Sequence, residues 1–225
     1  MKLGILFSGG KDSAYAAYLA KKQGHELKCL ITIISKNPES YMFHTPSIKK
    51  TKYQAKAMDI PVIFQKTKGI KEEELQDLEK AIKLAIKKYK IQGIVTGALQ
   101  SVYQTSRIKK ICEKLNIICL NLLWEKNRFQ YLNELIKNNF KVIITSVSAY
   151  PLDESWLGRE INEEFIRNIK EFNDKYKIHP AGEGGEFETF VIGCPLFKKR
   201  IKILSGRKIW KKDSGEYIIE KLKLI

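Results

Sequence analysis

The chain begins with Met1-Lys-Leu-Gly-Ile-Leu-Phe-Ser-Gly-Gly-Lys-Asp-Ser13, an apolar run that passes through two glycines into a polar segment. Residues 3–7 predict a buried strand, and apolar residues follow at helical spacing from Ser13 onward. A strand that enters a helix through a Gly-rich turn forms an anion site, because backbone N–H groups and the helix N-terminus point at one spot. The sequence therefore predicts an α/β fold with a phosphate-binding loop at residues 8–13.

The residue types in this loop suit phosphate binding. Gly9 and Gly10 allow backbone torsions and a close approach that a side chain would prevent. Lys11 adds a cation, and Asp12 adds a carboxylate that can hold Mg²⁺ on phosphate oxygens. The two better-known phosphate loops, Gly-x-x-x-x-Gly-Lys-Ser/Thr and Gly-x-Gly-x-x-Gly, have spacings that do not occur here. A plain strand–helix turn is the alternative, but packing alone does not explain a Lys beside an Asp at a helix start.

The segment Ser8-Gly-Gly-Lys-Asp-Ser13 closely resembles the pyrophosphate loop of the ATP pyrophosphatase superfamily. The resemblance implies that the protein binds ATP and splits it into AMP and pyrophosphate, usually to adenylate a substrate oxygen. It also implies that the loop residues bind ATP and that Asp12 holds Mg²⁺. These loop residues are Ser8, Gly9, Gly10, Lys11, Asp12 and Ser13.

Strand and helix patterns alternate through the first two thirds of the chain. Apolar runs at residues 27–34, 62–67, 93–97, 117–120 and 142–147 predict further strands, with helices between most of them. Such alternation predicts a Rossmann-like parallel sheet with right-handed crossovers. In the strand order 3-2-1-4-5, the HUP/PP-loop type, the order reverses between the first and fourth strands, and ligands bind at the carboxyl ends of the strands there.

This topology brings other residues toward the loop. Gly97, after the fourth strand, is expected to face residues 8–13, and Thr32, near the end of the second strand, is expected to flank adenine. His44 lies after the second strand and is either a neighbour of the nucleotide or a structural loop residue. The helix after the fourth strand begins with a turn that either faces the nucleotide and product phosphates or is solvated. The candidate residues of that turn are Tyr103, Gln104 and Arg107.

The sequence pattern changes after residue 149. Short apolar runs, split by glycines and charges, predict a small α+β annex that is mostly antiparallel, so we expect an ATP-binding domain at 1–149 and a substrate-binding annex at 150–225. Residues 182–189 of the annex place three glutamates and three glycines around one Phe. Such a loop costs backbone entropy and concentrates like charge, which a mere connection does not require. An acidic surface turn is the alternative.

Five segments, in order along the chain, resemble the diphthine–ammonia ligase family. They are Ser8-Gly-Gly-Lys-Asp-Ser13, Tyr41-Met-Phe-His-Thr45, Ile91-Gln-Gly-Ile-Val-Thr-Gly-Ala98, Ser148-Ala-Tyr-Pro-Leu-Asp-Glu-Ser-Trp-Leu-Gly158 and Gly182-Glu-Gly-Gly-Glu-Phe-Glu-Thr189. The resemblance implies the last step of diphthamide synthesis, in which the carboxylate of diphthine, a modified histidine on elongation factor 2, becomes an amide. It implies that ATP is consumed to AMP and pyrophosphate. Neither a glutaminase domain nor the extra C-terminal domain of longer eukaryotic members is expected, so free ammonium is the implied nitrogen donor.

The implied chemistry assigns roles to acidic and aromatic residues. A carboxylate resists ammonia until it is joined to AMP, and Lys11 and Asp12 would act on the departing pyrophosphate. The candidates that would hold ammonium and accept its proton are Glu183, Glu186 and Glu188, of which Glu186 and Glu188 are expected to be catalytic. Aromatic faces suit the trimethylammonium group of diphthine, and the candidates are Tyr150, Trp156 and Phe187, the last two being alternatively core residues. The other residues expected to bind substrate are Ser148, Asp153, Gly158, Gly184, Gly185 and Thr189.

The net charge of +16 arises from 35 Lys and 6 Arg against 25 acidic residues. Phosphate and base recognition favours Arg with its bidentate fork, and the lysines are scattered along the chain. We therefore expect a solvated basic surface rather than an RNA-binding face. A tRNA-modifying enzyme of the same superfamily and a non-catalytic nucleotide-binding protein are the alternative functions. The first often carries a Cys pair or an RNA-binding domain, and the second needs no acidic loop.

The remaining composition fits a globular protein. The 225 residues can bury a full core, and no apolar stretch approaches the ~20 residues that cross a bilayer. No signal peptide is visible, so we expect a cytoplasmic protein without membrane contact, with a homodimer as one candidate state. The four cysteines contain no Cys-x-x-Cys pair, which argues against a metal cluster or a disulfide framework and leaves the role of Cys194 open.

Overall fold

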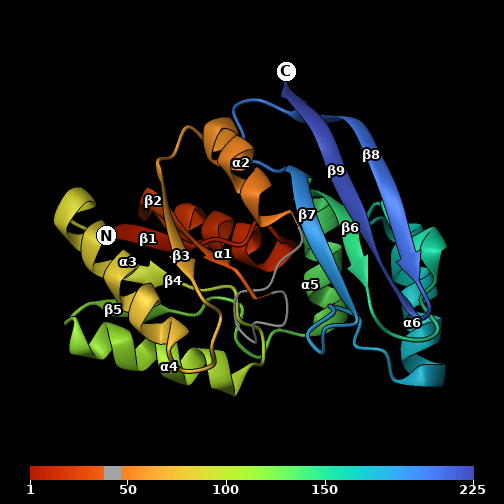
Figure 1. Ribbon diagram of the computed structural model, residues 1–225, viewed down its shortest axis with the longest axis horizontal. Coiled ribbons are helices and arrows are strands. Elements are labelled where there is room, and N and C mark those ends of the chain that lie inside the picture. The colour runs from red at the N-terminus through yellow and green to blue at the C-terminus, as the bar shows by residue number, and fades with distance from the viewer. Residues whose placement is uncertain (38–46) are drawn as a thin grey trace.

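Two sheets lie side by side, with helices on their faces and between them (Figure 1). The computed structural model describes residues 1–37 and 47–225. In this part of the chain, a five-stranded parallel sheet has the order β3-β2-β1-β4-β5, and a four-stranded sheet has the order β7-β6-β9-β8. The predicted order 3-2-1-4-5 and the smaller antiparallel annex are confirmed.

The parallel sheet is covered on both faces. Its strands are β1 (Lys2–Leu6), β2 (Glu26–Ser35), β3 (Val62–Thr67), β4 (Gly93–Val95) and β5 (Ile118–Leu120). Leu3 and Ile5 are fully buried, which is why β1 has an apolar run rather than the alternating pattern of a half-exposed strand. β1 is the central strand, and Ile5 lies opposite Leu30 of β2 and Val95 of β4.

The helices of this half divide between the two faces of the sheet. They are α1 (Lys11–Lys22), α2 (Thr51–Met58), α3 (Glu74–Tyr89) and α4 (Val102–Lys114), with a 3-10 turn η1 (Ile48–Lys50) before α2. α3 and α4 cover one face, where Leu78 and Ile108 pack in one apolar cluster with Ile31 and Ile94. α1 covers the other face, and its small residues, such as Ala17, are fully buried because the second sheet packs on its far side.

The second sheet includes the strand formed by the apolar run at residues 142–147, which the sequence pattern alone does not distinguish from a strand of the first sheet. The elements of this half are α5 (Arg128–Lys137), β6 (Lys141–Val147), η2 (Glu154–Trp156), α6 (Glu163–Tyr176), β7 (Phe187–Gly193), β8 (Ile201–Lys211) and β9 (Ser214–Leu224). β6 pairs antiparallel with β7 and β9, with Ile143 opposite Phe190. A strand buried on both faces has the same apolar pattern in either kind of sheet, so periodicity alone does not assign it. The prediction that the strand at residues 142–147 belongs to the parallel sheet is therefore wrong, because β6 lies in the second sheet. The domain boundary between residues 149 and 150 stays a prediction.

One apolar cluster joins the two halves of the molecule. It includes Tyr15 of α1, Tyr131 of α5, Phe165 of α6 and Phe187 of β7, all of them buried. β7 therefore lies against α1 and against the turn that leads into it. Among the described residues, no helix is both long enough and apolar enough to span a membrane.

Candidate functional site

The loop at residues 8–13 is closed by its own hydrogen bonds. Ser13 Oγ donates to the carbonyl of Gly10 at 3.1 Å and accepts from the N–H of Ser8 at 3.3 Å. The N–H of Gly10 donates to Ser8 Oγ at 3.3 Å. Gly9 has φ +86°, and a Cβ at this position would lie 2.5 Å from Gln54 Oε1. The loop thus needs glycine at position 9 for both its conformation and its packing.

The second sheet holds this loop from outside. Thr189 Oγ1, on β7, accepts the N–H of Lys11 at 3.1 Å. The carbonyl of Gly9 accepts the N–H of Val191 at 3.0 Å and Gln54 Nε2 at 2.9 Å. Thr189, expected to bind substrate, therefore contacts the backbone of the phosphate loop. Gln54 is a structural partner of the loop that sequence reasoning missed, because nothing in α2 marks it.

Gly97 faces the loop, as the topology predicts. A Cβ at Gly97 would lie 2.7 Å from the backbone N of Ser13 and 2.8 Å from the backbone C of Asp12. No side chain fits between the turn after β4 and the first turn of α1. This close contact places the carboxyl ends of β1 and β4 against each other, at the point where the strand order reverses.

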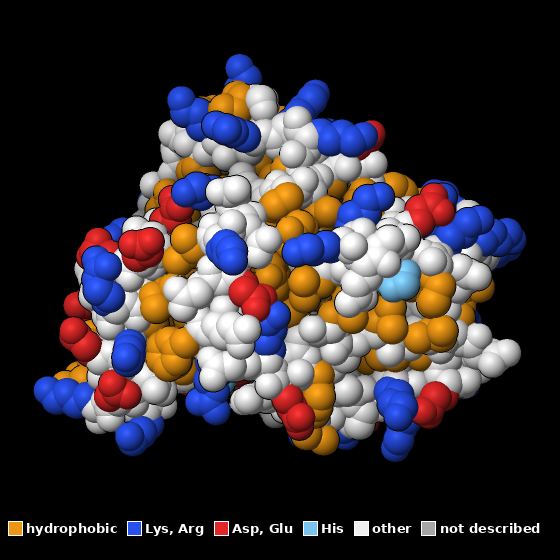
Figure 2. Space-filling view, turned by 180° about the vertical axis from the view of Figure 1, so that it is seen from behind, with side chains coloured by type: hydrophobic (Ala, Val, Ile, Leu, Met, Phe, Trp, Pro, Cys, Tyr) orange, Lys and Arg blue, Asp and Glu red, His pale blue; other side chains and the backbone are white. Residues whose placement is uncertain are grey.

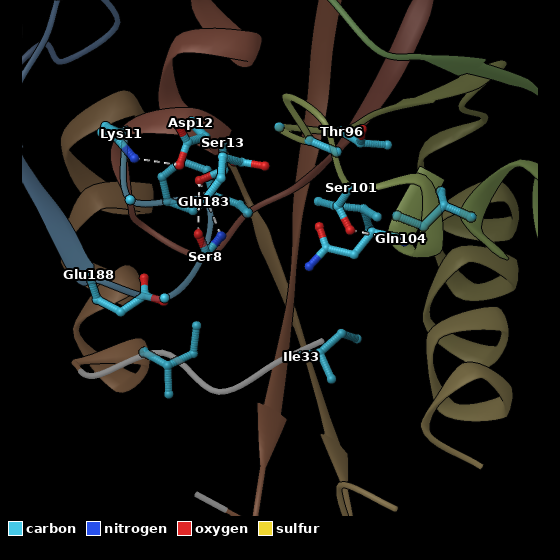
Figure 3. Close-up of a pocket in the computed structure, with 18 of the residues that line it drawn as sticks. Ser8, Lys11, Asp12, Ser13, Ile33, Thr96, Ser101, Gln104, Glu183 and Glu188 are labelled. Carbon is cyan, nitrogen blue, oxygen red and sulfur yellow. Dashed lines mark hydrogen bonds and ion pairs between the residues drawn. The ribbon is translucent and has the colours of Figure 1, made fainter. Parts of the chain in front are cut away.

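A cavity of about 510 Å³ opens at these strand ends. One wall is polar and contains Ser8, Lys11, Asp12 and Ser13, with Glu183 and Glu188 nearby (Figure 3). The rest of the lining is largely apolar and includes Leu6, Ile31, Ile33, Ile48 and Ile108, beside the polar Ser101 and Gln104. A cavity with a charged end and an apolar end suits a ligand that has an anionic group and a flat, apolar ring system.

Lys11 and Asp12 form an ion pair on the polar wall. Lys11 is only 3% exposed, and its Nζ donates to Asp12 Oδ2 at 2.9 Å. The second oxygen, Asp12 Oδ1, accepts the hydroxyl of Tyr131 at 2.8 Å. Tyr131 lies on α5, 119 residues away from Asp12, and sequence reasoning missed it because no local pattern links the two. Lys11 Nζ also lies 5.6 Å from the centroid of the Phe187 ring.

Two of the three predicted glutamates face the cavity. Burial raises the pKa of Glu188 to about 7, and the charges of Asp12 and Glu183 contribute to this rise although Lys11 opposes it. Burial, together with Asp12, also raises the pKa of Glu183, whose Oε2 accepts the N–H of Gln100 at 3.3 Å. Among the described residues, no hydrogen bond is made to the Glu188 carboxylate. Glu188 is therefore a half-buried carboxylate on the cavity wall that can take up and release a proton near neutral pH.

Glu186 has a different place from the one expected. Its Oε1 accepts the N–H of His179 at 2.9 Å, and its Oε2 accepts the N–H of Gly184 at 2.8 Å. His179 completes this arrangement, because its Nδ1 accepts the N–H groups of Ala181 and Glu183 at 3.2 and 3.3 Å. Burial lowers the pKa of His179, which keeps its ring neutral and able to accept. Glu186 thus shapes the acidic loop, and its carboxylate does not line the cavity.

Of the residues outside the loop expected to bind the nucleotide, some line the cavity and others do not. Gln104 lines the cavity, whereas the hydroxyl of Thr32 is buried and donates to the carbonyl of Phe7 at 2.8 Å. The side chains of Tyr103 and Arg107 do not line the cavity, since both donate to Glu72 Oε1, at 2.9 Å from the Tyr hydroxyl and 2.6 Å from Arg NH2. His44 lies outside the described residues.

The residues expected to bind substrate likewise fall into two groups, those that line the cavity and those that do not. Gly184, Gly185 and Phe187 line the cavity with Glu183 and Glu188. Trp156 is 4% exposed and packs against Phe165, so the core alternative holds for it. The remaining candidates belong to the turns after β6 and do not line the cavity. Ser148 donates its N–H to the carbonyl of Glu186, Tyr150 is 76% exposed, Asp153 caps η2, and Gly158 has φ +78° beside Tyr217.

A metal held by a cluster of protein side chains alone has no support among the described residues. No group of three or more His, Cys, Asp and Glu side chains that could hold a metal ion occurs there. Cys194 is buried, and burial raises the pKa of its thiol to about 12, so it stays protonated and unreactive.

The chain matches two family models, described as the diphthamide synthase N-terminal domain over residues 1–118 and the diphthamide synthase C-terminal domain over residues 127–225. Diphthine–ammonia ligase of Mus musculus is 34% identical over 93% of this chain and 85% of its own length. The human protein of the same name is 32% identical over 97% and 85%. That of Schizosaccharomyces pombe is 30% identical over 99% of this chain but only 39% of its own length.

A solved structure titled "The crystal structure of predicted subunit of tRNA methyltransferase from Methanocaldococcus jannaschii DSM" is also similar. It is 21% identical, with a TM-score of 0.46 over 87% of this chain and 98% of that one, which is too low to carry an inference. The family models and the curated relatives agree with each other and span most of the sequence. The chain therefore belongs to the diphthine–ammonia ligase family and is a ligase that forms a carbon–nitrogen bond.

Proposed function

We propose that this ligase converts the carboxylate of diphthine on elongation factor 2 into an amide, with ATP and ammonium as co-substrates and AMP and pyrophosphate as products. The observation that carries the proposal is the composition of one cavity. Its lining joins the phosphate-loop residues Lys11 and Asp12 to Glu188, a half-buried carboxylate whose pKa is raised to about 7. A protein that only binds a nucleotide needs the first feature but not the second.

The polar wall is suited to the triphosphate of ATP. The N-terminus of α1 and the Lys11 ammonium bring positive charge to the loop, and helix N-termini bind phosphate for this reason. The apolar wall, with Ile31, Ile33 and Ile108, is suited to the adenine ring. This arrangement points the phosphates toward the acidic loop, where the second substrate must enter.

Mg²⁺ fits the donors on this wall as a companion of the nucleotide. In phosphoryl-transfer sites Mg²⁺ is usually held by one or two carboxylates together with substrate phosphates and water. Asp12 is the carboxylate within the loop, and it keeps lone pairs beyond those that accept from Lys11 and Tyr131. When bound there, Mg²⁺ would neutralise charge on the phosphates. We propose Asp12 as its protein ligand.

The first step activates the substrate carboxylate. A carboxylate oxygen of diphthine attacks the α-phosphorus of ATP, the bond between the α- and β-phosphates breaks, and pyrophosphate leaves. The protein contributes position and charge, because Lys11 lies where negative charge accumulates on the leaving group. The product of this step is an acyl-adenylate with AMP as its next leaving group.

The second step forms the carbon–nitrogen bond. Ammonium must lose a proton before its nitrogen can attack, and Glu188 is the described carboxylate in the cavity whose pKa of about 7 suits this task at neutral pH. Ammonia then attacks the acyl carbon, AMP departs, and the nitrogen loses a further proton. Glu183, at the same wall, adds negative charge that favours binding of a cation.

The test is product formation by the purified protein with ATP, ammonium and diphthine-bearing elongation factor 2. We expect AMP, together with exchange of a hydroxyl for an amino group on the intact factor, measured by mass spectrometry. Factor without diphthine, and bulk tRNA, serve as control substrates and should give neither product. AMP formation that requires tRNA instead would support the tRNA-modifying alternative and contradict the proposal.

A further inference from the structure

Tyr131 is a fully buried residue whose hydroxyl makes one hydrogen bond among the described residues, to Asp12 on the cavity wall. The side chain is 0% exposed, and its hydroxyl donates to Asp12 Oδ1 at 2.8 Å. Burial and the neighbouring Asp12 carboxylate raise the pKa of this phenol well above its usual value, so it remains a protonated donor. Packing against the ring of Tyr15, with centroids 5.5 Å apart, fixes its direction.

The carboxylate of Asp12 is therefore held from two sides. Lys11 Nζ, which lines the cavity, donates to Oδ2 at 2.9 Å, and Tyr131 holds Oδ1 from the protein interior. The two donors together fix the plane of the carboxylate, because each oxygen has its own fixed partner. If the Tyr131 hydroxyl were absent, the Asp12 carboxylate would keep one side-chain partner among the described residues, Lys11, and only one of its two oxygens would be held.

We infer that Tyr131 is a positioning residue for the reaction, which acts through the orientation of Asp12. The inference rests on the proposed function, in which Asp12 serves the ATP phosphates and their Mg²⁺. A reaction that depends on position is sensitive to small displacements, and a shift of about 1 Å can cost roughly 100-fold in rate. Nothing in the sequence near Tyr131 marks this role, since α5 belongs to the second half of the chain.

The chain offers a closely matched control in Tyr15. It is 1% exposed, and its hydroxyl also donates to a carboxylate, Glu134 Oε2, at 2.7 Å. Glu134 pairs with Lys126 at 2.6 Å, and neither residue lines the cavity. Tyr15→Phe and Tyr131→Phe therefore both remove a hydrogen bond to a carboxylate from the same cluster, but only Tyr131→Phe affects a bond to Asp12. Tyr15→Phe also removes the acceptor of Asn138 Nδ2 at 3.3 Å, so it is the more demanding control for stability.

The test compares Tyr131→Phe, Tyr15→Phe, Asp12→Asn and the double variant Tyr131→Phe/Asp12→Asn in AMP formation. We expect kcat to fall about 10- to 100-fold in Tyr131→Phe, with a smaller change in KM for ATP, and to stay within about threefold of wild type in Tyr15→Phe. Thermal unfolding should show similar midpoints for the two Phe variants. The double variant should lose no more activity than Asp12→Asn, because both changes act on one carboxylate.

A second readout does not need turnover. Calorimetry measures the affinity for ATP with and without Mg²⁺, and the gain due to Mg²⁺ should shrink in Tyr131→Phe and Asp12→Asn but not in Tyr15→Phe. Asp12→Asn should lose both activity and the gain in ATP affinity that Mg²⁺ gives. If it does and Tyr131→Phe loses neither, the inference is wrong and the proposed function stands. If wild type forms no AMP, the proposed function fails, and the calorimetric comparison still decides whether Tyr131 positions Asp12.

Discussion

Three glutamates of one short loop have three different surroundings, although the sequence places Glu186 and Glu188 in the same expected role. Glu188 faces the cavity with a raised pKa, Glu183 faces it while accepting a backbone N–H, and Glu186 closes the loop on His179. The carboxylate most suited to proton transfer is therefore Glu188. Glu186 instead holds the backbone that presents it.

Glu188→Gln should be more stable than wild type at high pH. The unfolded carboxyl loses its proton near 4.5 and the folded one near 7, so between these values the folded state binds more protons and stability falls as pH rises. We expect the variant to gain roughly 1–3 kcal/mol of unfolding free energy at pH 8 and nothing at pH 4. Urea unfolding at both pH values measures this. Glu186→Gln, which loses a backbone hydrogen bond, should instead be less stable at pH 8, and a loss in Glu188→Gln would contradict its half-buried placement.

The same variant should lose amide formation while it keeps ATP binding. Gln cannot accept a proton from ammonium, so we expect a fall of about 100- to 10,000-fold in the rate of amide formation. In wild type this rate should rise with pH through about 7, the pKa of Glu188, when free ammonia is held constant, and the variant should lack this rise. Equal rates of amide formation for the variant and wild type would contradict a role of Glu188 in proton transfer.

Some residues of the candidate site could be predicted from short segments of the sequence, whereas others depend on contacts between distant parts of the chain. Lys11, Asp12, Glu183 and Glu188 could be predicted because each belongs to a short segment whose composition has a chemical reason. Tyr131 could not be predicted, because its meaning arises only from a contact with a residue 119 positions away. The expectation for Thr32 placed it beside adenine, whereas strand alternation turns its hydroxyl to Phe7 and leaves Ile31 and Ile33 at the cavity.

At the scale of elements, β7 connects the two halves of the site. It follows the acidic loop directly, and two of its residues, Thr189 and Val191, bond the backbone of the phosphate loop. The acidic loop and the loop at residues 8–13 are thereby joined through hydrogen bonds to a single strand. The parallel order was predictable from alternating strands and helices, but the partners of β6 were not, because its apolar pattern fits both sheets.

Thr189→Val tests this connection. It removes the acceptor of the Lys11 N–H, and a buried donor without a partner costs about 1–3 kcal/mol of stability. We also expect KM for ATP to rise severalfold, since the first turn of α1 loses its support. Thr145→Val is the matched control, because Thr145 on β6 is also buried and its hydroxyl has no hydrogen-bond partner among the described residues. That variant should match or exceed wild-type stability, and equal behaviour of the two variants would contradict the role of Thr189.

At the scale of the whole molecule, the excess of lysine and arginine over acidic residues gives a net charge of +16. On the face seen from behind, Lys and Arg side chains are dispersed, with Asp and Glu among them (Figure 2). Many of the described lysines also form surface ion pairs, such as Lys83 with Glu79 and Lys198 with Asp59. Such a surface attracts polyanions weakly and without shape selection.

Binding to bulk tRNA should therefore be weak and steeply dependent on salt. We expect affinity to fall about tenfold or more between roughly 50 and 200 mM salt, as counterion release requires. Fluorescence anisotropy with labelled tRNA measures it, and the diphthine-bearing factor provides the comparison. A tRNA complex that survives physiological salt and yields a modified tRNA would favour the alternative function.

The central claim is that the substrate carboxylate itself attacks ATP, and isotope transfer tests it most directly. Elongation factor 2 whose diphthine carboxylate carries ¹⁸O is converted by the enzyme with ATP and ammonium, and the AMP is analysed by mass spectrometry. The mechanism predicts that one carboxylate oxygen leaves with AMP, so that the label appears in its phosphate. Label that is absent from AMP, while the amide still forms, would contradict an acyl-adenylate and the site proposed for it.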